Sequence, residues 1–449
     1  MDDGLDACGL IDAFARGTTT PLAFAEQTLE RIADLDPFLN AYSAKSETFL
    51  EEARAATARW QNGKPVGQVD GVPVIVKDNL VTAGIPASWG NAALARRPCL
   101  HDERPVAALR AAGALIVGKG NTPEFAVEGF THNLTFGTTR NPFDPDLTPG
   151  GSSGGVVAAV ASGMAVAGLA TDGGGSIRRP AGYCGLYGLK TGLGHVGRGG
   201  GLPQILLDFE TVGPVARSLR DIRLLDAVLS GRPVRPPRAR QARILAVETL
   251  GDAPCDPEIR AAFAKTADAL RTAGHSVELG ALPVNLSDLN EGWGRIVEVG
   301  LAGYFASDPE VAQAAAPKYR EMAVRGAQVL ATAVQGTLSA VFALRNSVIG
   351  LWGFDAVLMP SSAAHPWPAT ESHPERIDGE PVGPRGHAIY TGWVNAAGLP
   401  AVAFPADRKH GLPIGMQLIG PIGSESDLLN ILEPVAPEFR WPPSAVRPS

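Results

Sequence analysis

The sequence reads Pro149-Gly-Gly-Ser-Ser-Gly-Gly155 and, further along, Asp172-Gly-Gly-Gly-Ser-Ile-Arg178. The Ala-, Val- and Gly-rich run between these two stretches suits a close-packed helix followed by a strand. Three glycines before Ser176 leave backbone N–H groups free to converge on one point, which is how an oxyanion hole is built from main chain. The two stretches therefore predict paired loops at one functional site.

Glycine-rich stretches of this kind occur in three further settings. The first is a pair of tight loops in which glycine only permits positive φ. The second is phosphate binding, because residues 192–197 match GxGxxG, but no strand leads directly into this match and no helix follows it. The third is an esterase nucleophile elbow, since residues 150–154 match GxSxG. The segment before it, 141–149, contains three prolines and so cannot be the central strand that an elbow needs.

A serine nucleophile that works without histidine is the fourth setting, and it needs another base. Lys77 is the best candidate, because it ends the apolar run 72–76 and precedes Asp78 and Asn79. A lysine amine acts as a base only when it is neutral, and burial lowers its pKa. The ordinary alternative is a lysine at a strand end whose amine reaches water.

Several longer motifs occur in a fixed order along the chain. They are Gly-Val-Pro-Val-Ile-Val-Lys-Asp-Asn (71–79), Gly-Lys-Gly-Asn-Thr-Pro-Glu-Phe (118–125), Phe-Gly-Thr-Thr-Arg-Asn-Pro (136–142), the two glycine-serine stretches, Cys-Gly-Leu-Tyr-Gly-Leu-Lys-Thr (184–191), Val-Gly-Pro-Val-Ala-Arg (212–217), Asn-Ala-Ala-Gly-Leu-Pro-Ala (395–401) and Leu-Pro-Ile-Gly-Met-Gln (412–417). In this order the chain resembles the amidase signature family, the Ser–cis-Ser–Lys amidohydrolases, over about residues 5–430.

The resemblance implies a role for each matching residue. Ser176 matches the acylated nucleophile, Lys77 the base, and Ser152 the relay serine that follows a cis peptide bond and contacts substrate. The backbone N–H groups of Gly173, Gly174, Gly175 and Ser176 would form the oxyanion hole, and Ala126 would line the acyl pocket. Gly173 and Val157 depart from the family pattern, because larger and smaller residues respectively are usual there. Neither a metal nor a cofactor is implied.

The fold expected is α/β, a single large amidase-signature domain over residues 1–449 with a mixed central sheet covered by helices on both faces. Short apolar runs predict strands at 72–76, 114–117, 244–247, 356–359, 401–404 and 415–419. Residues 1–62 are expected to form a helical cover, 63–220 the core with the catalytic residues, and 221–449 the rest of the sheet, further helices and substrate loops. Thr20 and Pro21 begin one predicted helix, which Asp36 and Pro37 are expected to end; others span about 46–60 and 257–272.

The net charge of the chain argues against nucleic acid and membrane partners. The 449 residues carry a net charge of −7, which gives no basic footprint for nucleic acid and no cationic surface for a membrane. The four cysteines stand far apart, and the N-terminus lacks the pattern of a secretory signal. We therefore expect a cytoplasmic protein with neither a nucleic-acid nor a membrane partner. The family resemblance implies a small-molecule amide or carbamate as substrate, and we expect a monomer or homodimer.

Specificity is expected from three loops, 199–209, 293–319 and 365–385. Their apolar residues suggest a wall that accepts an apolar or aryl amide, an anilide or a carbamate ester; these residues are Pro203, Ile205, Leu206, Leu207, Phe209, Trp293, Tyr304, Phe305 and Trp367. Two alternatives stay open: the glutamine-hydrolysing A subunit of an aminoacyl-tRNA amidotransferase, which works with protein partners, and a binding protein that keeps the fold without acylating.

Overall fold

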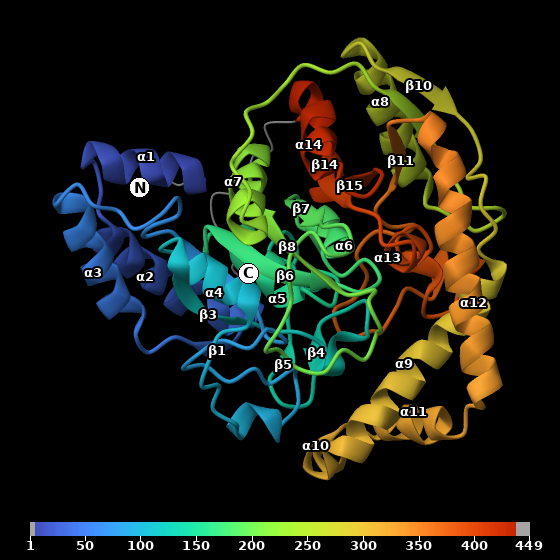
Figure 1. Ribbon diagram of the computed structural model, residues 1–449, viewed down its shortest axis with the longest axis horizontal. Coiled ribbons are helices and arrows are strands. Elements are labelled where there is room, and N and C mark those ends of the chain that lie inside the picture. Colours follow the sequence, from blue (N-terminus) through green and yellow to red (C-terminus); the bar gives the residue numbers. More distant parts are fainter. Residues whose placement is uncertain (1–4, 437–449) are drawn as a thin grey trace.

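A single mixed β-sheet runs through the middle of the molecule (Figure 1). The computed structural model describes residues 5–436, and in this range eleven strands form the sheet in the order β1-β3-β2-β6-β8-β7-β14-β15-β11-β9-β10. Their bounds are β1 Tyr42–Lys45, β2 Pro73–Lys77, β3 Leu115–Gly120, β6 Ala167–Asp172, β7 Tyr187–Lys190, β8 Thr211–Ala216, β9 Arg243–Ala246, β10 Ser276–Leu279, β11 Ala356–Pro360, β14 Ala401–Lys409 and β15 Leu412–Ile419. All six predicted strands are present. The short pairs β4 (His132–Asn133) with β5 (Gly137–Thr138) and β12 (Arg376–Ile377) with β13 (Glu380–Pro381) lie outside the sheet.

The sheet contains both parallel and antiparallel strand pairs. β2 lies between β3 and β6 and is parallel to both, whereas β8, β7, β14 and β15 pair antiparallel with their neighbours. The predicted mixed sheet is confirmed. Because the carboxyl ends of neighbouring parallel strands meet at one edge, the ends of β2 and β6 come together there.

Helices bury both faces of the sheet. On β2, Val74 and Val76 belong to one apolar core and Ile75 to the other, as the alternation of side chains along a strand requires. The first core also holds Ile222, and the second holds Val160. The helices are α1 Ala7–Arg16, α2 Pro21–Leu39, α3 Phe49–Gln61, α4 Arg104–Ala111, α5 Gly154–Ala161, α6 Arg178–Tyr183, α7 Leu219–Ser230, α8 Pro257–Thr272, α9 Ser287–Ser307, α10 Pro309–Ala314, α11 Pro317–Ala327, α12 Ala331–Ser347, α13 Gly392–Ala396 and α14 Glu425–Leu432.

The N-terminal segment differs from the expectation in two ways. The α2 helix begins as predicted, with the Thr20 hydroxyl accepting a hydrogen bond from Ala23 N at 3.1 Å, but it continues through Pro37 to Leu39. Pro37 has no N–H to donate to the carbonyl one turn earlier, and the helix ends soon after it, where Asn40 adopts a left-handed conformation. The segment also contributes β1, which pairs antiparallel with β3 at the edge of the sheet.

Residues 293–319, expected to be a loop, are mostly helical. They run from α9 through α10 into the start of α11, and α9 to α12 lie together on the right-hand side of Figure 1. In residues 5–436 no single helix is long and apolar enough to cross a bilayer. The segments 317–327 and 331–353, which contain α11 and α12, reach that length and apolar character only together, and they are bent by 98° relative to each other.

Candidate active site

Lys77 ends β2 and points its amine at the beginning of α5. Its side chain is fully buried, and Nζ donates to Ser152 Oγ at 2.8 Å, to Thr171 Oγ1 at 2.9 Å and to the Thr171 carbonyl at 3.2 Å. Thr171 is the penultimate residue of β6, so the meeting edge of β2 and β6 supplies the amine and its threonine partner. The ordinary alternative, a strand-end lysine whose amine reaches water, does not hold for this residue.

Burial lowers the pKa of Lys77 to about 8, and the carboxylates of Glu210 and Asp172 oppose that shift. Two other buried lysines share a pKa lowered by burial, Lys119 at about 8 and Lys190 at about 7. Lys119 Nζ bonds the Leu80 carbonyl and the Thr82 hydroxyl, and Lys190 Nζ bonds two carbonyls at 2.8 Å. Among these three lysines, only Lys77 has an amine that donates to a serine in the described residues.

Ser152 lies on the loop that leads into α5. The Gly151–Ser152 peptide bond is cis, as the sequence resemblance implied. The Ser152 carbonyl accepts from the Thr122 hydroxyl at 2.8 Å, and its side chain turns inward to Lys77. The residue is only 1% exposed.

The second loop, 172–178, is built around the Asp172 carboxylate. Its oxygens accept from Gly175 N at 2.6 Å and Ile177 N at 3.0 Å, and from both Nε and Nη2 of Arg178 at 3.0 Å. Arg178 and Asp172 are both fully buried, and the guanidinium helps to hold the pKa of Asp172 far below its usual range. Gly175 has φ +115°, and a Cβ there would lie 2.2 Å from Arg179 Nη1, so no other residue fits.

Asp172 changes the expected oxyanion hole. The Gly175 N–H, one of its four predicted donors, already donates to this carboxylate. In residues 5–436 the N–H groups of Gly173, Gly174 and Ser176 have no protein acceptor. The Ser176 hydroxyl also has no hydrogen-bond partner in that range, and no hydrogen bond joins it to Ser152.

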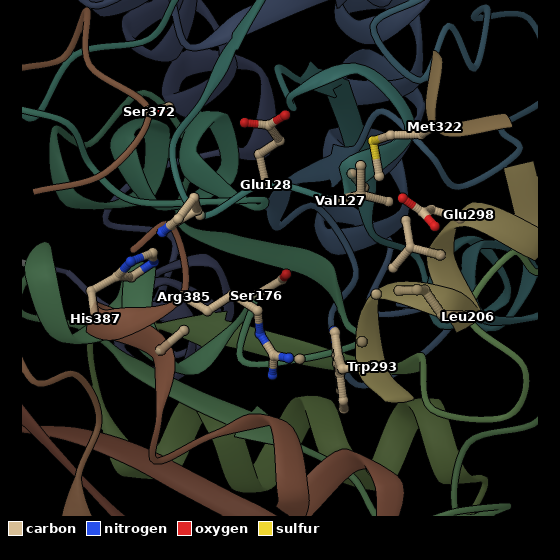
Figure 2. A pocket seen from close by; sticks show the side chains of 18 of the residues that line it. Val127, Glu128, Ser176, Leu206, Trp293, Glu298, Met322, Ser372, Arg385 and His387 are labelled. Carbon is tan, nitrogen blue, oxygen red and sulfur yellow. The ribbon is translucent and has the colours of Figure 1, made fainter. Parts of the chain in front are cut away.

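Ser176 opens into a cavity of about 420 Å³, shown in Figure 2. Gly173, Gly174 and Ala126 line this cavity with it, which agrees with their predicted positions in the site. Ser152, predicted to contact substrate, is not among the lining residues because its side chain faces Lys77 from behind the wall.

Leu206 and Trp293 form the wall over the glycines. A Cβ at Gly173 would lie 2.5 Å from Leu206 Cδ1, and one at Gly174 would lie 3.0 Å from the Trp293 ring. Glycine at position 173, where the family usually has a larger residue, is thus explained by Leu206, which occupies the space that a larger residue would need.

The other seven residues of the predicted apolar wall are not among those that line this cavity. Tyr304 and Phe305 pack around Phe125, and Trp367 packs on Tyr183 and His387. The sequence analysis assigned too many residues to this wall, because aromatic residues fill protein cores as readily as they line pockets. The cavity instead draws Gly294, Val297 and Glu298 from one face of α9, and Pro384 and Arg385 from the predicted loop 365–385.

Several polar lining residues escaped the sequence analysis, among them Arg179, Arg385 and His387. Arg179 directly follows Arg178 in a quoted motif, so an unexplained second arginine was the available signal. Arg385 and His387 lie more than 200 residues from Ser176 in the chain, and no local pattern could place them beside it.

Known proteins match this chain over most of its length. The family model described as Amidase matches residues 23–429. The glutamyl-tRNA(Gln) amidotransferase A subunit of Thermus thermophilus is 32% identical over 92% of this chain and 93% of the relative, and that of Synechococcus sp. is 33% identical over 91% and 87%.

Solved structures match over nearly the whole chain. A crystal structure of an amidase has a TM-score of 0.88 and 31% identity, and covers 96% of this chain and 99% of its own. A bacterial aryl acylamidase of the amidase signature family has the same TM-score at 26% identity, with 99% of both chains covered. The chain therefore belongs to the amidase signature family and is an amidohydrolase that acts on amide C–N bonds.

Proposed function

We propose that the enzyme cleaves small amides through an acyl-enzyme at Ser176, with Ser152 as the proton relay and Lys77 as the base. The observation that supports this most strongly is the 2.8 Å hydrogen bond from Lys77 Nζ to Ser152 Oγ. A buried amine with a pKa near 8 holds a substantial neutral fraction at neutral to mildly alkaline pH, and a neutral amine accepts a proton.

The first half of the reaction makes an ester. Ser176 Oγ attacks the amide carbon while its proton passes to Ser152 and the Ser152 proton passes to Lys77. Negative charge collects on the carbonyl oxygen, where the N–H groups of Gly173, Gly174 and Ser176 would stabilise it. The proton then returns from Lys77 through Ser152 to the nitrogen as the C–N bond breaks.

Water completes the cycle. It attacks the ester carbon and gives its proton along the same relay, and the acid leaves as Ser176 regains its hydroxyl. The step that this proposal adds to the observed contacts is a hydrogen bond between the hydroxyls of Ser152 and Ser176, formed when substrate is bound. Catalytic hydrogen bonds often tighten only in that complex.

Two substrate groups fit this site, each with its own support. An aryl or apolar amide, an anilide or a carbamate ester would rest on Leu206, Trp293 and Val297, and one structural neighbour is an aryl acylamidase. Glutamine is favoured by the curated relatives, which are amidotransferase A subunits; in that case the chain would work with partner proteins.

Assays of the purified chain on an anilide, an aryl carbamate and glutamine separate these candidates. Turnover of the anilide or the carbamate supports the free-standing amidase. Glutamine hydrolysis, alone or only with partner subunits, supports the amidotransferase. A chain that turns over none of them and leaves Ser176 unmodified by a fluorophosphonate is a binding protein on the same fold, and the proposed reaction is then wrong.

A further inference from the structure

The cavity carries more positive charge than its own carboxylates balance. Its acids are already paired: Glu128 accepts from Lys318 Nζ at 2.6 Å and from the Tyr319 hydroxyl at 3.2 Å, and Glu298 pairs with Arg325 at 2.7 Å. Arg179 and Arg385 also line the cavity, and in residues 5–436 neither has a carboxylate within ion-pair distance.

Arg179 is fixed next to the nucleophile. It lies three residues after Ser176, is 5% exposed, and its Nη1 donates to the Gly174 carbonyl at 2.5 Å and to the Thr391 hydroxyl at 2.7 Å. Its Nε is buried and has no acceptor in the described residues. A buried guanidinium with neutral partners and an unused donor is costly unless an anion joins it.

Arg385 supplies a second guanidinium from the loop before α13. Its side chain lies 4.7 Å from the centroid of the Trp293 ring, the residue that covers Gly174, and makes no hydrogen bond within residues 5–436. Stacking on Trp293 orients the planar group while leaving its edge donors free. Figure 2 shows His387 on one side of Ser176, with Leu206 and Trp293 on the other.

His387 adds unpartnered polar atoms to the same side. The ring is 2% exposed, and neither ring nitrogen has a partner in the described part of the chain. Burial and the neighbouring charges of Arg179 and Arg385 hold its pKa well below the ordinary value, so the ring is neutral and offers one donor. A buried polar group without a partner in the protein needs an explanation, and beside a cavity a bound ligand is one.

We propose that Arg179, Arg385 and His387 form an anion subsite beside Ser176, and that the preferred substrates are amides that also carry a carboxylate. This rests on the proposed reaction at Ser176 and narrows its substrate class. Arg385 is the group expected to contact the carboxylate, because its donors are all unused. Arg179 acts as a fixed charge behind it. An apolar portion of the substrate then lies on Leu206 and Trp293.

Paired substrates test the charge directly. Succinamate carries a carboxylate on the acyl side, and N-acetyl-4-aminobenzoate carries one on the amine side; succinamide and 4-acetamidobenzamide are their neutral counterparts. For at least one pair we expect kcat/KM to favour the carboxylate by about tenfold or more, the worth of one charged hydrogen bond. The pair that responds identifies which side of the scissile bond faces the subsite.

Variants assign the preference to residues. Arg385→Met should remove it, so that kcat/KM becomes equal within each pair, because the charged contact is then absent for the carboxylate. Arg271→Met, an exposed arginine on α8 far from the cavity, should keep the preference. Equal kcat/KM values within both pairs, or a preference that survives Arg385→Met, would overturn the subsite.

Binding to an inactive variant separates this inference from the reaction. Ser176→Ala protein is titrated calorimetrically with the same four compounds. Tighter binding of a carboxylate than of its neutral counterpart, lost in Ser176→Ala/Arg385→Met, supports the subsite even if no compound is turned over by the native enzyme. Equal binding within both pairs contradicts the subsite, and it does so without bearing on acylation of Ser176.

Discussion

Lys77 Nζ donates to Ser152 Oγ at 2.8 Å from a fully buried position at the end of β2. Residues 75 positions apart are held together because β2 and the neighbouring parallel strand β6 end beside the first turn of α5. Within residues 5–436 the amine has no carboxylate in hydrogen-bond contact, and so burial dominates its pKa. This arrangement suits the proposed role of Lys77 as a base.

Replacing the Lys77 amine should slow catalysis strongly. We expect Lys77→Met to lower kcat by about 10²–10⁴, the range for removal of a general base, because Ser152 then has no group to pass its proton to. The variant keeps most of the buried volume, and circular dichroism should show a folded chain. Lys265→Met, an exposed lysine on α8, is the matched control and should retain native kcat. A folded Lys77→Met enzyme with native kcat would remove the lysine from the mechanism.

The pH dependence follows from the direction of the Lys77 shift. The neutral amine is the active form and its pKa is about 8, so kcat/KM should rise about tenfold per pH unit below that value and level off above it. With an unshifted lysine the limb would lie near its ordinary pKa of about 10.4. A profile flat from pH 6 to 9, measured on a neutral substrate, argues against lysine as the base.

The buried ion pair under the nucleophile loop should matter for folding. Arg178→Met leaves the Asp172 carboxylate buried without its guanidinium, and loss of one partner of such a pair costs about 3–5 kcal/mol. Urea unfolding should show that loss in the free energy of unfolding. Arg271→Met breaks an exposed pair with Asp268 and should cost about 0–1 kcal/mol. A similar small loss in both variants would mean that the buried pair is dispensable.

Gly173 and Leu206 should behave as a coupled pair. Gly173→Ala places a Cβ 2.5 Å from Leu206 Cδ1, which forces either the loop or the leucine to move and should lower kcat. Leu206→Ala frees that space. In the double variant we expect kcat to recover above that of Gly173→Ala, as a double-mutant cycle for contacting residues requires. Purely additive effects of the two changes would show that the clash is not what limits Gly173→Ala.

The sequence predicted the parts of this molecule that local pattern controls. Apolar runs marked six strands, and the ordered motifs brought Lys77, Ser152 and Ser176 into one hypothesis before any geometry. The predicted helix end at Asp36 and Pro37 was early, because the helix continues past Pro37 to Leu39 although proline cannot donate the backbone hydrogen bond expected there.

What escaped prediction depends on contacts between distant segments. Asp172 competes for the Gly175 N–H only because the loop folds back on its first residue. Arg385 reaches the cavity by stacking on Trp293, which comes from a helix some ninety residues earlier in the chain. Tyr304 and Phe305 pack against Phe125 in the core and do not line the cavity. Composition alone does not separate these outcomes.

Covalent labelling of Ser176 tests the central claim most directly. The native enzyme is incubated with an alkyl fluorophosphonate, digested and analysed by mass spectrometry. We predict one phosphonyl adduct, located on Ser176, that forms much more slowly in Lys77→Met and Ser152→Ala and at the native rate in Lys265→Met. An adduct on another residue, or labelling of Ser176 at the native rate in Lys77→Met, would contradict the relay from Lys77 through Ser152.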